Sequence, residues 1–209
     1  ITLRAFNPVN DIFANAIEFT NLNGAINVDN GNATFEGNEP LHAGKIGGKS
    51  IWYSFTPTNN GILTLSTTNS TIDTLLSLYT GERINELAVV VANDDAGAGL
   101  VHHSEISSGV IAGRKYKIAI DGLSGASGTI VLHHSFATAD VYTLTAGSTS
   151  GGSVQPGSGV YSSNTLVSLV AVTNSGFNFI TWTGGVVSLD NPLTFNVRSN
   201  IGVTAMFGR

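Results

Sequence analysis

The sequence predicts an all-β protein, with an antiparallel β-sandwich in its first part and a smaller β module in its second. Strand-like runs recur about every eight to twelve residues, and a cluster of turn-forming residues fills each gap between them. Hydrophobic residues make up 42% of the chain and charged residues only 11%, which argues against disorder and against a coiled coil. The 25 glycines suit short strands closed by tight turns.

The first part contains seven runs rich in β-branched and aromatic residues. They are expected to be strands at residues 50–55, 61–67, 74–79, 88–92, 105–106, 116–120 and 128–133. Turns are expected between them, among others at 57–61, 93–97 and 121–122. The segment 11–19 is compatible with a short helix that Asn10 or Asp11 would cap.

The pattern restarts at residues 137–140, which predicts a boundary between a domain at 1–138 and a domain at 139–209. The second part contains six shorter runs. They are expected to be strands at 142–146, 153–154, 165–172, 177–183, 193–197 and 203–207. Glycine-rich turns are expected at 151–152 and 156–159. With about 70 residues, this domain is near the lower limit of independent stability.

Charge and composition exclude several classes of function. The net charge is −5, and no basic run is longer than Arg114 and Lys115, so no nucleic-acid partner is expected. No apolar stretch approaches the roughly 20 residues that would insert into a membrane. The absence of cysteine excludes disulfides, thiol catalysis and cysteine-ligated zinc. A chain that is acidic, free of cysteine and rich in Gly, Asn and Thr favours a secreted or cell-surface bacterial protein.

The first part resembles the bacterial pre-peptidase C-terminal domain. Six segments carry the resemblance, in order: NDIFANA at 10–16, EPLHAG at 39–44, KSIWYSF at 49–55, DTLLSLYTG at 73–81, NDDAG at 93–97 and YKIAIDG at 116–122. They span roughly 130 residues of the chain. The resemblance implies a β-sandwich of jelly-roll type that accompanies catalytic or adhesive domains and performs no chemistry itself.

The second part resembles the divergent internalin-type B-repeat, a small β-grasp-like module of bacterial surface proteins. The residues that carry it are GGSV at 151–154, Tyr161, VSLVA at 167–171, GFNFITWTG at 176–184, NPLT at 191–194 and VTAMF at 203–207. The resemblance covers nearly all of 140–209. It implies a spacer or adhesion module without enzymatic activity.

The acidic loop at Asn93, Asp94 and Asp95 is the sharpest candidate for a binding site. Adjacent carboxylates repel each other unless solvent or a cation neutralises them, and calcium prefers six to eight such oxygen ligands. Related pre-peptidase domains bind calcium with the segment that leads into the sandwich together with acidic loops. By that resemblance, the ligands expected for Ca²⁺ are Asn10, Asp11, Glu39 (or Glu36), Asp73, Asp94 and Asp95.

A simpler interpretation of this loop remains open. Asn93, Asp94 and Asp95 are also typical turn residues that bond to their own backbone, and their spacing does not match the EF-hand loop. Asp73, at the head of an apolar strand, lies either at the sheet end facing solvent or buried with partners. The second is expected, with backbone amides or the cation as partner.

Two histidine pairs suggest a zinc site as a further alternative. Neighbouring residues of a strand point to opposite faces, so one pair cannot chelate a metal with both rings. A site would need one histidine of 102–103, one of 133–134, and a carboxylate such as Glu105.

No catalytic motif is found, so the chain is not expected to be an enzyme. A Gly-x-Ser-x-Gly elbow is absent, and the paired glycines at 151–152 and 184–185 do not open a helix that would bind phosphate. A pair of acids such as Glu36 and Glu39 lies in a Gly- and Asn-rich loop, with nothing to place the two across a cleft.

Aromatic residues offer a possible platform for stacking sugars. Trp52 alternates with Tyr53 and Phe55 on one expected strand, so Tyr53 and Phe55 share a face and Trp52 takes the other. Trp182 is expected to anchor the core of the second domain.

These observations lead to two hypotheses. The first is a non-catalytic accessory segment that spaces, stabilises or tethers a catalytic or adhesive domain of a larger secreted bacterial protein, its partners being the neighbouring domains. The alternative is a carbohydrate-binding module that recognises a polysaccharide or a cell-surface glycan.

Overall fold

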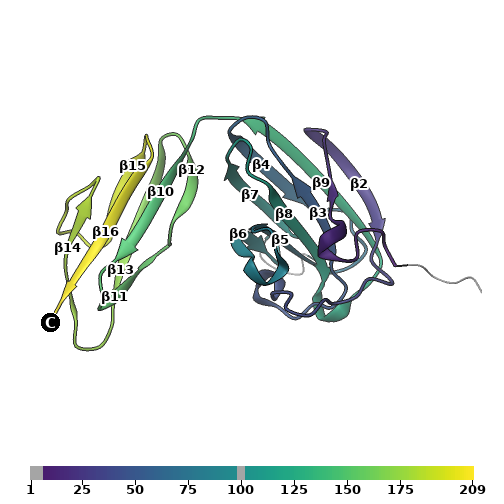
Figure 1. The fold of residues 1–209 in the computed structure, drawn as a ribbon, viewed down its shortest axis with the longest axis horizontal. Coiled ribbons are helices and arrows are strands. Elements are labelled where there is room, and N and C mark those ends of the chain that lie inside the picture. Colours follow the sequence, from purple (N-terminus) through teal and green to yellow (C-terminus); the bar gives the residue numbers. More distant parts are fainter. Residues whose placement is uncertain (1–6, 98–101) are drawn as a thin grey trace, which may run out of the picture. The chain divides into compact units, whose positions relative to one another are not determined.

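The computed structural model describes residues 7–97 and 102–209, and it confirms the predicted all-β fold. The chain divides into two compact units, residues 1–138 and 139–209 (Figure 1). The helical segments of the described residues are short 3₁₀ turns: Phe13–Asn15 (η1), His42–Gly44 (η2), Ile84–Glu86 (η3) and Leu123–Gly125 (η4). In this described part, no helix has the length and apolar character needed to cross a membrane.

The first unit is a sandwich of two sheets. The first sheet has the strand order β1-β3-β8-β5-β6. Its strands are β1 (Ile17–Glu18), β3 (Ile51–Phe55), β5 (Thr74–Thr80), β6 (Ala88–Asn93) and β8 (Tyr116–Gly122). The second sheet has the order β2-β9-β4-β7. Its strands are β2 (Asn23–Asp29), β4 (Gly61–Ser66), β7 (Glu105–Val110) and β9 (Thr129–Thr138).

Alternation of buried and less buried residues along the strands builds the core between these two sheets. On β4 the buried Leu63 and Leu65 alternate with half-buried residues, as expected for a strand with one face towards the core. On β3, Tyr53 and Phe55 point into this core, while Trp52 points to the opposite face of the sheet. The predicted division of these aromatic residues between the two faces is therefore confirmed.

The central strands of the first sheet, β3, β8 and β5, are buried on both faces, because chain segments cover their outer side. β3 is buried over its whole length, and so is β8. On the outer face, Phe13 packs edge-on against Trp52 at a centroid distance of 5.2 Å, and the Trp52 amide donates to the Asn10 carbonyl at 2.9 Å. Phe13, Trp52, Tyr79 and Ala119 form a second, smaller apolar cluster there.

The helix expected at 11–19 is wrong. The segment forms only the 3₁₀ turn Phe13–Asn15, whose N-cap residue is Ile12 and which has no side-chain cap. It then continues as β1, which pairs in parallel with β3, with Ile17 opposite Tyr53. Tertiary packing against the first sheet overrides the weak helical preference of so short a segment.

The second unit consists of two further sheets. One has the order β12-β10-β16-β14 and the other β11-β13-β15. The strands are β10 (Val141–Ser148), β11 (Gly152–Gln155), β12 (Gly159–Ser162), β13 (Thr165–Thr173), β14 (Asn178–Gly184), β15 (Leu193–Val197) and β16 (Ile201–Gly208). The first and last strands of the unit, β10 and β16, are parallel neighbours, with Leu144 opposite Ile201 and Ser148 opposite Ala205.

The core of the second unit is built around Trp182. This side chain is fully buried, and its Nε1 donates to the Asp190 carbonyl at 2.9 Å. Leu144, Leu169 and Val203, from three different strands, belong to the same buried cluster. The sequence therefore placed Trp182 correctly as a core anchor.

Candidate metal centre

Three aspartates meet where β5 begins and β6 ends. Asp73 directly precedes β5, and Asp94 and Asp95 directly follow β6. The two strands are antiparallel neighbours, with Leu76 opposite Asn93, so the start of one lies beside the end of the other. Strand pairing therefore brings together acids that lie about 20 residues apart in the sequence.

The three carboxylates are close enough to share one cation. One oxygen from each of Asp73, Asp94 and Asp95 lies within 4.8 Å of the others. The side chain of Asp73 is 26% exposed and that of Asp94 is 20% exposed. The Oδ1 atoms of Asp73 and Asp94 are buried and have no hydrogen-bond partner among residues 7–97 and 102–209. Buried carboxylate oxygens without a partner are costly, which makes this the place where a cation has most to stabilise.

Two side chains neutralise this cluster in part. The Lys45 ammonium lies 3.6 Å from Asp94 Oδ2, and its side chain is 54% exposed. His102 Nδ1 lies 3.2 Å from Asp73 Oδ2. One ammonium and one exposed imidazole do not balance three carboxylates at neutral pH. The donor set, consisting of carboxylate oxygens at the ends of strands, fits calcium better than zinc, which prefers nitrogen and sulfur.

Backbone contacts fix the loop that carries the acids. The Asn93 amide group donates to the Asp95 carbonyl at 2.9 Å and accepts from the Glu105 amide at 3.0 Å. Ser104 Oγ donates to the Asp94 carbonyl at 2.8 Å. The turn interpretation thus holds for Asn93, whereas no backbone bond accounts for the carboxylates of Asp94 and Asp95 in the described residues.

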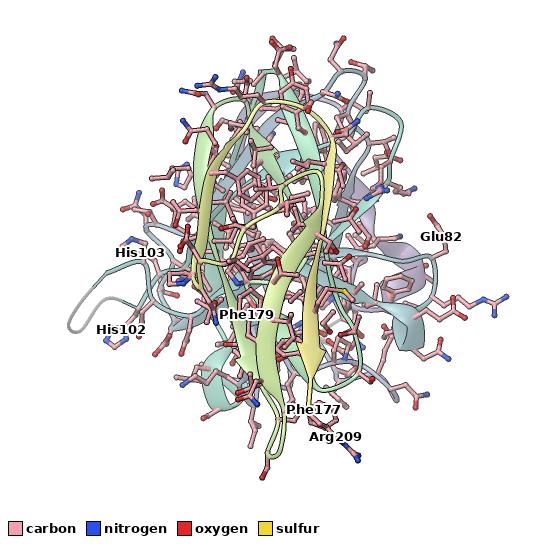
Figure 2. All side chains as sticks on the ribbon, turned by 90° about the vertical axis from the view of Figure 1, so that its left-hand side faces the viewer. Glu82, His102, His103, Phe177, Phe179 and Arg209 are labelled. Atoms are coloured by element: carbon pink, nitrogen blue, oxygen red, sulfur yellow. The ribbon has the colours of Figure 1, made fainter. Side chains whose placement is uncertain are left out.

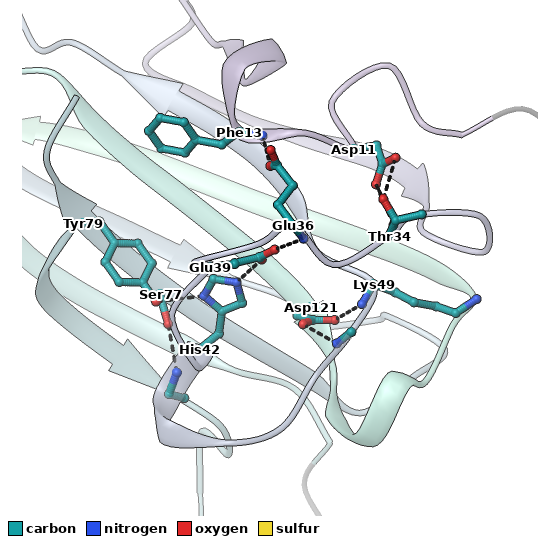
Figure 3. Close-up of polar contacts among 12 residues, drawn as sticks. Asp11, Phe13, Thr34, Glu36, Glu39, His42, Lys49, Ser77, Tyr79 and Asp121 are labelled. Carbon is teal, nitrogen blue, oxygen red and sulfur yellow. Dashed lines mark hydrogen bonds and ion pairs between the residues drawn. The ribbon is translucent and has the colours of Figure 1, made fainter. Parts of the chain in front are cut away.

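The other residues expected as metal ligands have different partners. The Asn10 side chain donates to the Trp52 carbonyl at 3.0 Å. Asp11 accepts from the Thr34 amide at 2.6 Å and from the Asn7 side chain at 2.6 Å. Both residues therefore hold the entry segment in place on the sandwich, and Figure 3 shows the contact of Asp11 with Thr34.

Glu36 and Glu39 also bind backbone. Glu36 accepts from the Phe13 amide, and Glu39 Oε2 accepts from the Glu36 amide at 2.9 Å. Glu39 Oε1 lies 2.7 Å from His42 Nε2. The expected set thus divides into the aspartate cluster at 73, 94 and 95, and a separate network around Asn10, Asp11 and Glu39.

The sequence did not indicate the partners of Glu39. His42 Nδ1 lies 2.8 Å from the Tyr79 hydroxyl, which completes a chain Glu39–His42–Tyr79 (Figure 3). A proton on Nε2 donated to Glu39 leaves Nδ1 to accept from Tyr79. Burial raises the pKa of Tyr79. All three side chains are buried, so the chain links a loop to the first sheet and offers no group to a substrate.

The structure does not support the zinc alternative. His102 contacts Asp73, His133 Nε2 lies 3.1 Å from the Thr68 carbonyl, and His134 is stacked on Phe19. Within the described residues, no cluster joins a histidine of each pair to Glu105. The reason is that the two pairs are held by different neighbours.

The expected sugar-stacking platform is not formed by the aromatic residues considered for it. Trp52, Tyr53 and Phe55 are 0%, 2% and 3% exposed, and Trp182 is fully buried. All four serve as core residues.

Comparison with known proteins gives a family match in the second unit and a similar solved structure. Residues 142–209 match the family model of the divergent InlB B-repeat domain. Among solved structures, the chain is similar to the pre-peptidase C-terminal domain of a collagenase from Bacillus anthracis, at 16% identity and a TM-score of 0.38. The alignment covers 57% of this chain and 93% of that domain. No curated protein matches the sequence.

Proposed function

We propose that the chain is a non-catalytic accessory segment of a larger secreted or surface bacterial protein. Its role is to space, stabilise or tether a catalytic or adhesive domain of that protein. The observation that carries this proposal is the match of residues 142–209 to the B-repeat family. The large buried side chains of this region form one apolar core. Two separate β units in tandem fit a spacing role. Two buried acids of the first unit, Glu39 and Asp121, accept from backbone amides and so have a structural role.

We further propose that calcium binds at Asp73, Asp94 and Asp95 and stabilises the first unit. The support is the 4.8 Å grouping of the three carboxylates together with the two buried oxygens that lack partners. Such an ion would tie the start of β5 to the loop after β6, in addition to the strand pairing already there. Calcium in this role would be structural, since it lies beside no candidate catalytic group.

Thermal unfolding with and without calcium tests this site. A cation that binds only the folded state stabilises it by about 2.7 kcal/mol at 100-fold excess over Kd. Calcium should therefore raise the Tm of the wild type by several degrees, and EDTA should reverse the shift. An unchanged Tm in both conditions would show that the cluster holds no calcium.

Asp94→Asn separates cation binding from simple charge repulsion. The variant should lose the calcium-dependent rise in Tm, and without calcium it should be at least as stable as the wild type, because one repelling charge is gone. Glu82→Gln, an exposed acid elsewhere in the same unit, is the matched control and should keep the full calcium response. Equal calcium responses in Asp94→Asn and the wild type would contradict the assigned ligands.

A further inference from the structure

An open hollow lies at the other end of β5 from the aspartate cluster. Its volume is about 670 Å³, and it is lined by residues 80–82 on one side and 111–115 on the other. The first wall is the end of β5 and the loop after it, and the second is the turn between β7 and β8. Since β5 has seven residues, the hollow and the cluster are about 20 Å apart.

Hydrogen bonds and close backbone contacts hold both walls of the hollow. Gly113, with φ +73°, donates its amide to the Pro57 carbonyl at 2.8 Å, and the Arg114 amide donates to the Ile111 carbonyl at 3.2 Å. Gly81 has φ +130°, and a Cβ there would lie 2.7 Å from the Glu86 carbonyl oxygen. The turn geometry therefore fixes the backbone from which the side chains at the rim project.

Two opposite charges at this rim have no partner in the described part of the chain. Arg114 and Glu82 are both exposed, and neither side chain forms a hydrogen bond or an ion pair there. Figure 2 shows Glu82 projecting outwards from its loop. Lys115, in contrast, is paired with Glu18 at 3.3 Å. The hollow thus presents one free guanidinium and one free carboxylate.

Cations are concentrated on this side of the first unit. Three of the nine Lys and Arg residues, Arg114, Lys115 and Lys117, fall within four positions of a chain whose net charge is −5. Burial, and after it the charge of Lys115, lower the pKa of Lys117, whereas the nearby charges of Glu82 and Glu18 raise it. Cations and acids therefore lie close together in this part of the unit.

The two free groups select a ligand by its chemistry. A guanidinium binds a carboxylate with two parallel hydrogen bonds. A carboxylate only accepts hydrogen bonds, so Glu82 fits a ligand with donors such as hydroxyl groups. The Thr80 hydroxyl at the same rim can either donate or accept a hydrogen bond. A polyphosphate would be repelled by Glu82, and a neutral sugar would leave Arg114 without a partner. A sugar that carries both hydroxyls and a carboxylate satisfies both.

We propose that the hollow between Thr80–Glu82 and Ile111–Lys115 binds a uronic acid unit of an acidic polysaccharide, with Arg114 on its carboxylate and Glu82 on its hydroxyls. This goes beyond the accessory role, because it gives the first unit a ligand on a surface that calcium does not reach. It also replaces the stacking platform with a polar site that has no aromatic wall.

Affinity electrophoresis of the full chain in gels containing polygalacturonate tests the proposal, with neutral dextran for comparison. EDTA is present throughout, so that failure of calcium binding does not affect the result. Polygalacturonate should retard the wild type, and dextran should not. Arg114→Ala should weaken binding by about tenfold or more, whereas Arg198→Ala, which removes the same charge from the second unit, should leave it unchanged.

Glu82→Ala distinguishes sugar recognition from attraction by charge alone. If Glu82 accepts from hydroxyls, its removal weakens binding to polygalacturonate; if only charge matters, the loss of a repelling carboxylate strengthens binding. Both substituted side chains are exposed, and circular dichroism checks that the variants are folded. No retardation of the wild type, stronger binding by Glu82→Ala, or equal binding to dextran sulfate, a sulfated polymer without carboxylates, would each overturn the proposal.

Discussion

His134 is the histidine of the first unit whose surroundings most oppose a positive charge. Its side chain lies on β9, is 7% exposed, and stacks on Phe19 at a centroid distance of 4.5 Å. Burial lowers the pKa of His134. The His134 ring therefore binds a proton more readily in the unfolded chain than in the folded chain. The contribution of neutral His134 to the unfolding free energy is complete above about pH 6.5 and is lost as the pH falls below that value.

His134→Phe should reduce this pH dependence. The ring keeps its stack on Phe19 and no longer titrates, so the unfolding free energy of the variant should fall less on acidification than that of the wild type. Urea unfolding above and below about pH 6.5 measures the difference. His103→Gln serves as the control, since the hydrogen bond of that residue within the described part of the chain is made by its backbone, and its slope should match the wild type. Equal slopes in all three proteins would show that His134 is not the responsible group.

At the scale of elements, Asp121 shows how one side chain positions a whole segment. It is buried within β8 and accepts from the amides of Gly48 and Lys49, both at 2.8 Å (Figure 3). Gly47 passes so close that a Cβ would lie 1.8 Å from Asp121 Oδ2. The segment that leads into β3 is therefore fixed by a carboxylate from another strand.

Gly47→Ala should destabilise the first unit by about 2 kcal/mol or more, because the new methyl group forces Asp121 away from the amides it binds. Gly37→Ala is the matched control, since a Cβ there meets nothing within 4 Å, and its effect should stay within about 0.5 kcal/mol. Denaturant unfolding of both variants provides the measurement. Similar losses of stability in the two variants would mean that the general effect of replacing glycine by alanine on the backbone outweighs the contact with Asp121.

Elements with strong alternation were predictable from the sequence, and elements that depend on partners were not. β4 and β5 begin at the expected residues, whereas β2 was missed because its residues are polar and mostly exposed, with only Ile26 and Val28 packed on the core. Asp121 and Gly122 were expected to form a turn, but they end β8. A carboxylate whose partners are distant amides has the same local signature as a turn residue.

The candidate metal centre shows the same limit. Asp94 and Asp95 stood out by their adjacency, and the resemblance added Asp73, which the structure places beside them. The contacts of Lys45 and His102 with these acids come from chain crossings that no local pattern encodes. For Asn10 and Asp11, local sequence could not distinguish a metal ligand from an anchor that binds backbone.

At the scale of the whole molecule, the two units have separate cores. The buried cluster around Leu65 and Ile118 consists of first-unit residues, and the cluster around Trp182 consists of second-unit residues. Each unit also contains one tryptophan, Trp52 or Trp182, and both are fully buried. Each core is complete without side chains from the other unit.

Residues 139–209 should therefore fold when produced alone. Trp182 should then show the emission of a buried indole, and thermal unfolding should be cooperative, with a modest stability expected for a domain of about 70 residues. Trp182→Phe in the same fragment provides the background signal. A fragment with solvent-exposed tryptophan emission and no cooperative transition would show that this core depends on the first unit.

The parallel pairing of β10 with β16 determines how the second unit would carry mechanical load. Because the strands run in the same direction, the start of β10 at Val141 and the end of β16 at Gly208 lie at opposite ends of the pair. A pulling force applied at these two points acts along the strands, so the hydrogen bonds between them resist in shear together instead of opening one after another. A link with this geometry transmits tension in line before it yields.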